Sequence, residues 1–218
     1  MEKKEFYRLS LPHFQQSIQS YFVTWCLKDA VLAKALPQYT EKLYNLRSEI
    51  NILKKNKANK TVINQVQMEY YLTRKKFIKA YDDLLHLQQS SIVNLSKESN
   101  REIIIEALTF WEGEKLENYA FCIMSNHVHW VFKIYEKDNA GQIIYLQDIM
   151  QSIKRFTANK LNKLENRTGN LWHKESFDTT IRDEKHLFNA INYTINYPVE
   201  AKLVPNWEDW KGTRLFDI

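Results

Sequence analysis

The fold of this chain is decided by the stretch Tyr119-Ala120-Phe121-Cys122-Ile123-Met124-Ser125-Asn126-His127-Val128-His129-Trp130-Val131-Phe132-Lys133-Ile134-Tyr135. Aromatic and β-branched residues dominate both halves, a composition typical of buried β-strands. The polar pair Ser125-Asn126 separates the halves and indicates a tight turn. The stretch therefore predicts two strands, over residues 119–124 and 127–135, with a short turn between them.

His127 and His129 occupy alternate positions of the second predicted strand. Side chains two residues apart on a strand project from the same face, about 7 Å apart along the chain. Two imidazoles so placed can converge on one divalent metal ion, held on a rigid sheet. Ordinary core or surface histidines are the alternative interpretation, since a His-x-His triplet also arises by chance.

The segments on either side predict how this pair of strands is completed. Residues 20–27 are dense in β-branched and aromatic residues and predict a first strand. Apolar residues at helical spacing predict helices over 99–112 and 146–164, and a short strand is expected over 177–181. Asp183 is expected to cap a last helix that Pro198 stops after about Tyr197. The order β-α-β-β-α-β plus a helix predicts an α+β, ferredoxin-like antiparallel sheet with the two histidines near its middle.

A different pattern interrupts this order after the first strand. Apolar residues recur in steps of three and four on both sides of a Lys/Asn-rich break at 54–60. We predict an antiparallel helical hairpin inserted over residues 38–89 and projecting roughly 30 Å. Its basic residues fit a solvated helix face, with a phosphate backbone or a second protomer as the alternative partner. They are Lys54, Lys55, Lys57, Lys60, Arg74, Lys75, Lys76 and Lys79.

Composition describes a folded chain with one core of ordinary size. Its 218 residues are 44% hydrophobic, and only four Gly and four Pro favour long helices over a turn-rich β-sandwich. A net charge of +5 and a pI near 9.0 permit a nucleic-acid partner without establishing one. Cys26 and Cys122 lie in apolar runs typical of buried thiols in a reducing compartment. Without a leader-like segment or an apolar run of about 18 residues, we expect a soluble cytoplasmic protein with no membrane partner.

Two further features are candidates for chemistry. Tyr193 on the last helix is either a nucleophile or an amphipathic packing residue. Residues 151–174 contain six Lys or Arg against one acidic residue and predict a path for single-stranded nucleic acid, with a solvated helix face as the alternative. Within this segment Trp172 is either a hydrophobic plug behind the sheet or a platform on which a base stacks. The DNA-binding candidates are Lys154, Arg155, Lys160, Lys163, Arg167, Trp172 and Lys174.

Five short motifs occur together in one order along the chain: residues 125–129 (Ser-Asn-His-Val-His), 150–157, 171–178, 181–184 and 193–204. In this register the chain resembles the REP-associated tyrosine transposases of the single-tyrosine HUH transposase superfamily. The resemblance covers about residues 15–35 and 97–210 and excludes the hairpin. It implies one HUH transposase domain over residues 1–218, with the hairpin as an insertion.

The resemblance also implies roles for individual residues. His127 and His129 match the pair that holds a divalent metal, usually Mg²⁺ or Mn²⁺, against the scissile phosphate. Tyr193, five residues before Pro198, matches the nucleophile that attacks DNA to give a 5′-phosphotyrosine and a free 3′-hydroxyl. The implied partner is single-stranded or hairpin-forming DNA, from repeats or the ends of a mobile element.

One position departs from the family pattern. Members often carry Asn or Gln four residues after the tyrosine as a third metal ligand, but here that position is Tyr197 and Asn196 lies one residue early. Either Asn196 reaches the metal from a distorted last turn, or the third ligand is another group or water. Tyr197 is also an alternative nucleophile, although the spacing to Pro198 favours Tyr193.

The departure leaves rival functions open. A domesticated, catalytically silent protein that binds hairpin DNA would need no complete metal site. A hydrolase that activates water between the histidines would need a carboxylate ligand, and the sequence places none beside the pair. The hairpin could support a homodimer, so a monomer and a dimer are both compatible with the sequence.

Overall fold

The computed structural model describes residues 6–8, 12–14, 18–30, 37–87, 91–174 and 176–217. The chain divides into two compact units, one formed by Met1–Ala30 with Gln89–Ile218 and the other by Val31–Gln88. The second unit coincides closely with the predicted insertion. None of the helices in the described segments is long and apolar enough to span a lipid bilayer.

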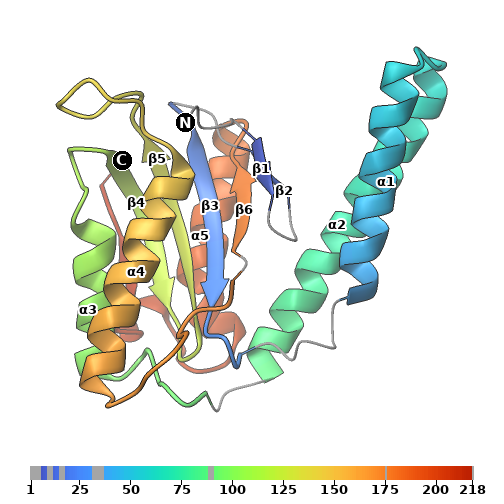
Figure 1. The fold of residues 1–218 in the computed structure, drawn as a ribbon. Coiled ribbons are helices and arrows are strands. Elements are labelled where there is room, and N and C mark those ends of the chain that lie inside the picture. Colours follow the sequence, from blue (N-terminus) through green and yellow to red (C-terminus); the bar gives the residue numbers. More distant parts are fainter. Residues whose placement is uncertain are drawn as a thin grey trace. The chain divides into compact units, whose positions relative to one another are not determined.

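The first unit is built on a five-stranded antiparallel sheet with the order β6-β3-β5-β4-β7 (Figure 1). The strands are β3 (Ser20–Cys26), β4 (Leu116–Ile123), β5 (His127–Ile134), β6 (Phe177–Thr180) and β7 (Thr213–Leu215). The first four strands have the ferredoxin-like arrangement, so the predicted fold class is confirmed. β5 is the central strand, as the sequence predicted. β7 pairs with β4 at the edge of the sheet, and the sequence did not predict this strand.

Helices cover both faces of this sheet. α3 (Glu98–Thr109) and α4 (Leu146–Leu164) contact one another on one face, and α5 (Glu184–Glu200) packs on the other against β4 and β5 (Figure 1). Successive side chains of β5 point alternately toward α3 and toward α5. Trp130 hydrogen-bonds Asn118, whose amide donates to the Leu108 carbonyl of α3, whereas Val131 packs against Ile191 and Ile195 of α5. His127 and His129 share the face of Val131, so they lie under α5.

The end of α5 corrects one prediction. The helix continues through Pro198 to Glu200 instead of stopping near Tyr197. Proline removes only its own N–H donor. The helical hydrogen bonds continue after it, since the Ala201 N–H donates to the Tyr197 carbonyl at 2.9 Å. Tyr197 is 0% exposed, and its burial holds the residue before the proline in the helical conformation that it would otherwise avoid.

Smaller elements complete the first unit. β1 (Phe6–Arg8) and β2 (Pro12–Phe14) form a separate two-stranded sheet, and η1 (Trp207–Asp209) is a short 3₁₀ turn before β7. Sequence patterns predicted none of these three, because each has only three residues and shows no periodicity.

The second unit is the predicted helical hairpin. α1 (Pro37–Lys55) and α2 (Lys60–Leu87) pack against each other through a buried seam and are joined by four residues. Leu43, Leu46 and Ile50 are buried on α1, and near the start of this helix the Tyr39 ring meets Phe77 of α2 with ring centroids 6.0 Å apart. The predicted end of the insertion at residues 88–89 lies outside the described residues.

Candidate metal centre

The two histidines of β5 point their Nε2 atoms at one another. His127 and His129 are each 1% exposed, and their Nε2 atoms lie 3.1 Å apart. Two ligands at about 2.1 Å from one octahedral ion, at right angles, would be separated by about 3.0 Å. The pair therefore has the spacing that a single divalent ion needs.

The other ring nitrogen of each histidine is hydrogen-bonded to a side chain. Nδ1 of His127 lies 2.6 Å from Oδ1 of Asn126, and Nδ1 of His129 lies 2.8 Å from Oγ1 of Thr24. An amide oxygen only accepts, so His127 carries its proton on Nδ1, whereas the Thr24 hydroxyl can either accept from or donate to Nδ1 of His129. If the hydroxyl accepts, the Nε2 lone pairs of both histidines are directed at one point, where a single cation can bind them. The residues present thus fit a divalent metal as two of its ligands.

Pairing between strands places these supporting residues. Thr24 of β3 lies directly opposite His129 of β5, and Asn126 directly precedes β5. The sequence interpretation gave neither residue a role. Asn126 could have been suspected from its place beside His127, but the register that brings Thr24 to His129 joins residues more than 100 positions apart and leaves no local signal.

Tyr193 and Tyr197 reach the histidine pair from α5. Asp183 caps the start of this helix by accepting a hydrogen bond from the His186 N–H at 2.8 Å. Residues four positions apart lie one turn apart on the same face of a helix. Both tyrosine rings consequently meet His129, with ring centroids 5.5 Å away for Tyr193 and 4.1 Å for Tyr197.

The two tyrosines differ in exposure. Tyr193 is half-buried and makes an edge contact with Phe22. Tyr197 is 0% exposed, packs on His127 as well as His129, and clusters with Cys122 and Met124. Burial raises the pKa of Cys122 to about 12, so this neighbour packs as a neutral thiol. Tyr193 is therefore the tyrosine nearer to solvent, and Tyr197 is part of the core over the histidines.

Asn196 directs its amide along its own helix. Its Nδ2 donates to the Asn192 carbonyl at 2.9 Å, one turn earlier. Within the described segments, no three His, Cys, Asp or Glu side chains come together as a metal site. The family pattern has an amide one turn after Tyr193. In this chain that position is Tyr197, and its ring packs against both histidines. The assignment of Asn196 as third ligand stays a prediction.

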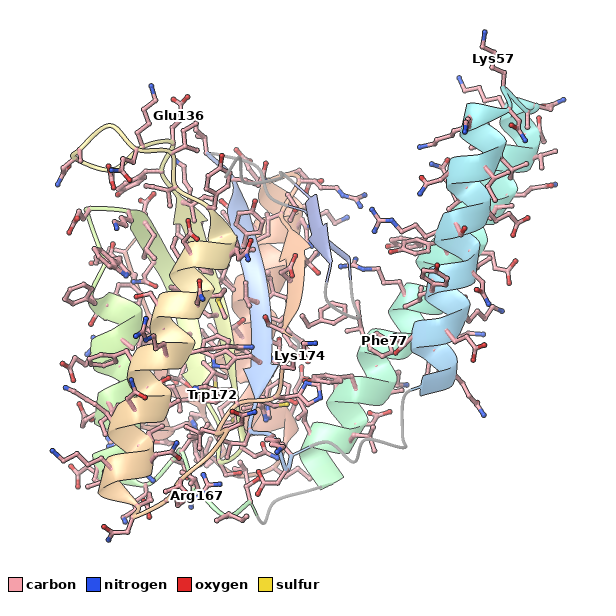
Figure 2. All side chains as sticks on the ribbon, in the orientation of Figure 1. Lys57, Phe77, Glu136, Arg167, Trp172 and Lys174 are labelled. Carbon is pink, nitrogen blue, oxygen red and sulfur yellow. The ribbon has the colours of Figure 1, made fainter. Side chains whose placement is uncertain are left out.

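Most of the predicted DNA-binding residues lie on the opposite side of the sheet from this site. Lys154, Arg155, Lys160 and Lys163 belong to α4, and Arg167 follows it (Figure 2). Lys160 pairs with Glu106 at 2.9 Å, and Lys154 donates to the His173 carbonyl at 3.3 Å. The structure does not bring this basic helix together with the histidine pair, because the sheet lies between them.

The loop after α4 returns toward the histidines. The His173 N–H donates to the carbonyl of Cys26, which lies opposite His127 in the sheet. The exposed Lys174 is therefore at the same end of the sheet as His127. Trp172 is 7% exposed and donates from Nε1 to Oγ1 of Thr157 at 2.9 Å, below α4 (Figure 2). Its burial favours the packing interpretation over a platform for bases.

Fold and site together define a ferredoxin-like protein with a paired-histidine centre beside two tyrosines of one helix. No family model matches the chain. The chain is 31% identical over 103 residues to the Haemophilus influenzae protein named "Putative REP-associated tyrosine transposase", a match that covers 45% of this chain and 58% of the relative. The chain thus matches little more than half the length of that relative. The match confirms the resemblance to REP-associated tyrosine transposases.

A solved structure is also similar. It is described as "Structure of the REP associates tyrosine transposase bound to a REP hairpin" and aligns with 98% of this chain and 82% of its own, at 12% identity and a TM-score of 0.46.

Proposed function

We propose that this protein is a metal-dependent transposase that cuts and rejoins single-stranded DNA through a covalent bond to Tyr193. The observation that carries the proposal is the 3.1 Å approach of the His127 and His129 Nε2 atoms beside the half-buried Tyr193. The similarity to a REP-associated tyrosine transposase supports the same reaction class. Mg²⁺ or Mn²⁺ is the proposed ion.

In the proposed reaction the phenol oxygen of Tyr193 forms a bond to the phosphorus of a phosphodiester while the bond from phosphorus to the 3′-oxygen breaks. The phenol loses its proton and the departing oxygen gains one, leaving a 5′-phosphotyrosine and a free 3′-hydroxyl. A second 3′-hydroxyl can reverse the step and join two strands, so no nucleotide cofactor is needed.

A phenol with an ordinary pKa of about 10 is a weak nucleophile at neutral pH. A divalent ion held by His127 and His129 would supply charge withdrawal from the phosphate, which lowers the barrier. Thr24 and Asn126 would keep both imidazoles in the tautomer that binds the ion. The imidazoles are 1% exposed, so a phosphate can approach an ion bound to them only after a neighbouring side chain moves. Tyr197 is the side chain that packs on both imidazoles.

The proposed substrate is hairpin-forming repeat DNA or the end of a mobile element. Lys174 lies at the His127 end of the sheet and is the predicted DNA-binding cation best placed for a strand that enters the site. Arg155 and Lys163 are exposed on the far face and would contact only DNA that continues around the sheet.

A denaturing gel tests the proposal. A single-stranded hairpin oligonucleotide labelled at its 3′ end, which stays on the fragment joined to the tyrosine, is incubated with Mn²⁺ and the wild type, Tyr193→Phe or Tyr197→Phe. We expect a covalent protein–DNA band with the wild type and with Tyr197→Phe, and none with Tyr193→Phe, which still shifts the oligonucleotide on a native gel. If Tyr193→Phe forms the band and Tyr197→Phe does not, Tyr197 is the nucleophile and the assignment is wrong.

A catalytically silent DNA-binding protein is the second candidate. The observation that favours it is Tyr197 at the position where the family pattern has an amide ligand, together with the engagement of Asn196 by Asn192. Tight binding of the hairpin oligonucleotide by the wild type, with neither a nick nor an adduct at any Mn²⁺ concentration, would establish this alternative.

A further inference from the structure

The turn that joins α1 and α2 concentrates positive charge. Between Ile50 and Met68 the sequence has four lysines, Lys54, Lys55, Lys57 and Lys60, and no acidic residue. All four are exposed, and none takes part in an ion pair found among the described residues. Figure 2 shows Lys57 at the extreme tip of the helical hairpin. We call these four residues the tip lysines.

The backbone of this turn is fixed. The Ala58 N–H donates to the Leu53 carbonyl at 2.9 Å and the Lys57 N–H to the Lys54 carbonyl at 3.2 Å, the two bonds of a Schellman motif. Oδ1 of Asn59 accepts the Thr61 N–H at 2.8 Å and caps the start of α2. The tip lysines thus project from a rigid turn at the end of a 19-residue helix that is about 28 Å long.

Local stability accounts for only two of the four charges. Lys54 and Lys55 lie in the last turn of α1, where cations are favourable. Lys57 has a φ of 51° at the Schellman position that glycine favours, where a side chain costs about 1 kcal/mol. Lys60 begins α2, whose first turn has no acidic residue, and a cation there opposes the helix dipole.

The second arm of the hairpin carries further basic residues, Arg74, Lys75, Lys76 and Lys79, but all the acidic residues of the hairpin also lie outside the tip. The acidic residue nearest to the tip lysines in the sequence is Glu49, five positions before Lys54, and Glu69 pairs with Lys42 at 2.9 Å. The other acidic residues of α1 and α2 are Glu41, Asp82 and Asp83. Around the tip lysines the neighbouring polar groups are instead the amides of Asn56, Asn59, Asn64 and Gln65. Exposed ammonium groups with amides and no carboxylates suit a polyanion, and in particular the phosphate backbone of DNA.

From this arrangement we propose that the tip lysines are a second, sequence-independent DNA-binding site that contacts phosphates outside the segment processed at the histidine centre. The inference rests on the proposed function only for the identity of the polyanion. Since the tip and the histidine centre belong to one chain, binding at one raises the effective concentration of the same DNA at the other.

Salt dependence of binding measures the tip contact directly. Each phosphate contact contributes a slope of about 0.7 to 0.9 to the fall of log affinity with log salt. The comparison uses the wild type, a variant with all four tip lysines changed to Gln, and a matched variant with all four changed to Arg. The probes are a stem-loop alone and the same stem-loop with a flanking duplex of about 20 base pairs, roughly 68 Å.

We expect the wild type to bind the flanked stem-loop more tightly than the stem-loop alone. The Gln variant should lose that gain, with a roughly tenfold loss of affinity for the flanked probe and a slope lower by about 2 to 4. The Arg variant should retain both, and adduct formation on the stem-loop alone should be unchanged in all three proteins. Circular dichroism at 222 nm checks that the hairpin stays helical.

Equal slopes for the wild type and the Gln variant would overturn the inference while leaving the proposed function intact. A smaller mass of the Gln variant than of the wild type, measured by light scattering without DNA, would also overturn the inference. The tip lysines would then join two copies of the chain. Absence of any adduct from the wild type, with the difference in slope still present, would overturn the proposed reaction and leave the tip site standing.

Discussion

The ring of Tyr197 lies over the histidine pair, with its centroid 4.1 Å from that of His129 and 5.1 Å from that of His127. It is fully buried, whereas Tyr193, one turn earlier, is half-buried. A residue that is apolar over most of its surface thus occupies the place nearest the proposed metal. The two tyrosines consequently have separate roles in the proposed function. Tyr193 is the nucleophile, and Tyr197 shields the histidine pair from solvent.

Changing Tyr197→Asn should tighten metal binding. The amide oxygen would stand one turn after Tyr193 on the face that meets both histidines, and such oxygens bind Mg²⁺ and Mn²⁺. We expect roughly tenfold higher Mn²⁺ affinity by calorimetry, against a loss of about 3 kcal/mol in the free energy of unfolding for the buried ring. Asn196→Ala is the matched control and should leave the Mn²⁺ affinity unchanged. A large loss of affinity in that control would show that Asn196 is the third ligand after all.

Changing Thr24→Val should weaken metal binding. The substitution keeps the shape of the side chain but removes the oxygen that lies 2.8 Å from Nδ1 of His129. Loss of such a supporting hydrogen bond typically lowers metal affinity 10–100-fold. Thr157→Val removes an equally buried hydroxyl on the opposite face of the sheet and should affect stability without affecting Mn²⁺ affinity. Equal effects of the two variants on Mn²⁺ binding would argue against a role for Thr24.

Changing Trp172→Phe should lower stability and leave DNA binding unchanged. The indole N–H donates to Oγ1 of Thr157 and the ring packs edge-on against Trp25. We expect a loss of about 1–2 kcal/mol in the free energy of unfolding by urea titration. In a Thr157→Val background the loss should be smaller, because the shared hydrogen bond is already absent. A selective loss of affinity for single-stranded DNA, with stability unchanged, would instead support base stacking on Trp172.

Changing Glu165→Gln should reduce stability at neutral pH only. The Asn100 amide donates to Oε1 of Glu165 at 2.7 Å and, with Lys97 acting in the same direction, holds the pKa of Glu165 below its ordinary value of 4.5. A lowered pKa means that the carboxylate contributes stability above that ordinary value and loses it as the pH falls through the lowered one. Because Glu165 is 23% exposed, solvent screens part of the effect, and we expect about 1 kcal/mol at pH 7.

Urea unfolding at neutral pH and near pH 3 compares the two proteins. The difference between the wild type and Glu165→Gln should shrink at the acidic end. A difference that is equal at both pH values would mean that shape, and not charge, accounts for the contribution of Glu165.

Much of the fold was predictable because its signals are local. The alternation around His127 and His129 identified the central strand, and steps of three and four identified the hairpin helices on both sides of Lys57. The error at Pro198 has the opposite origin. The local rule that proline ends a helix was overridden by the burial of Tyr197, which depends on strands distant in the sequence.

The sequence by itself determined that two imidazoles share one face of a strand and that Tyr193 and Tyr197 share one face of a helix, because both follow from the repeat of the backbone. Only the tertiary structure decided that Thr24 supports His129, that Tyr197 covers the pair, and that α4 with its basic residues lies behind the sheet. These depend on strand register and on which face each helix packs against. Contacts between residues far apart in the chain set both, and no periodicity within a segment reports them.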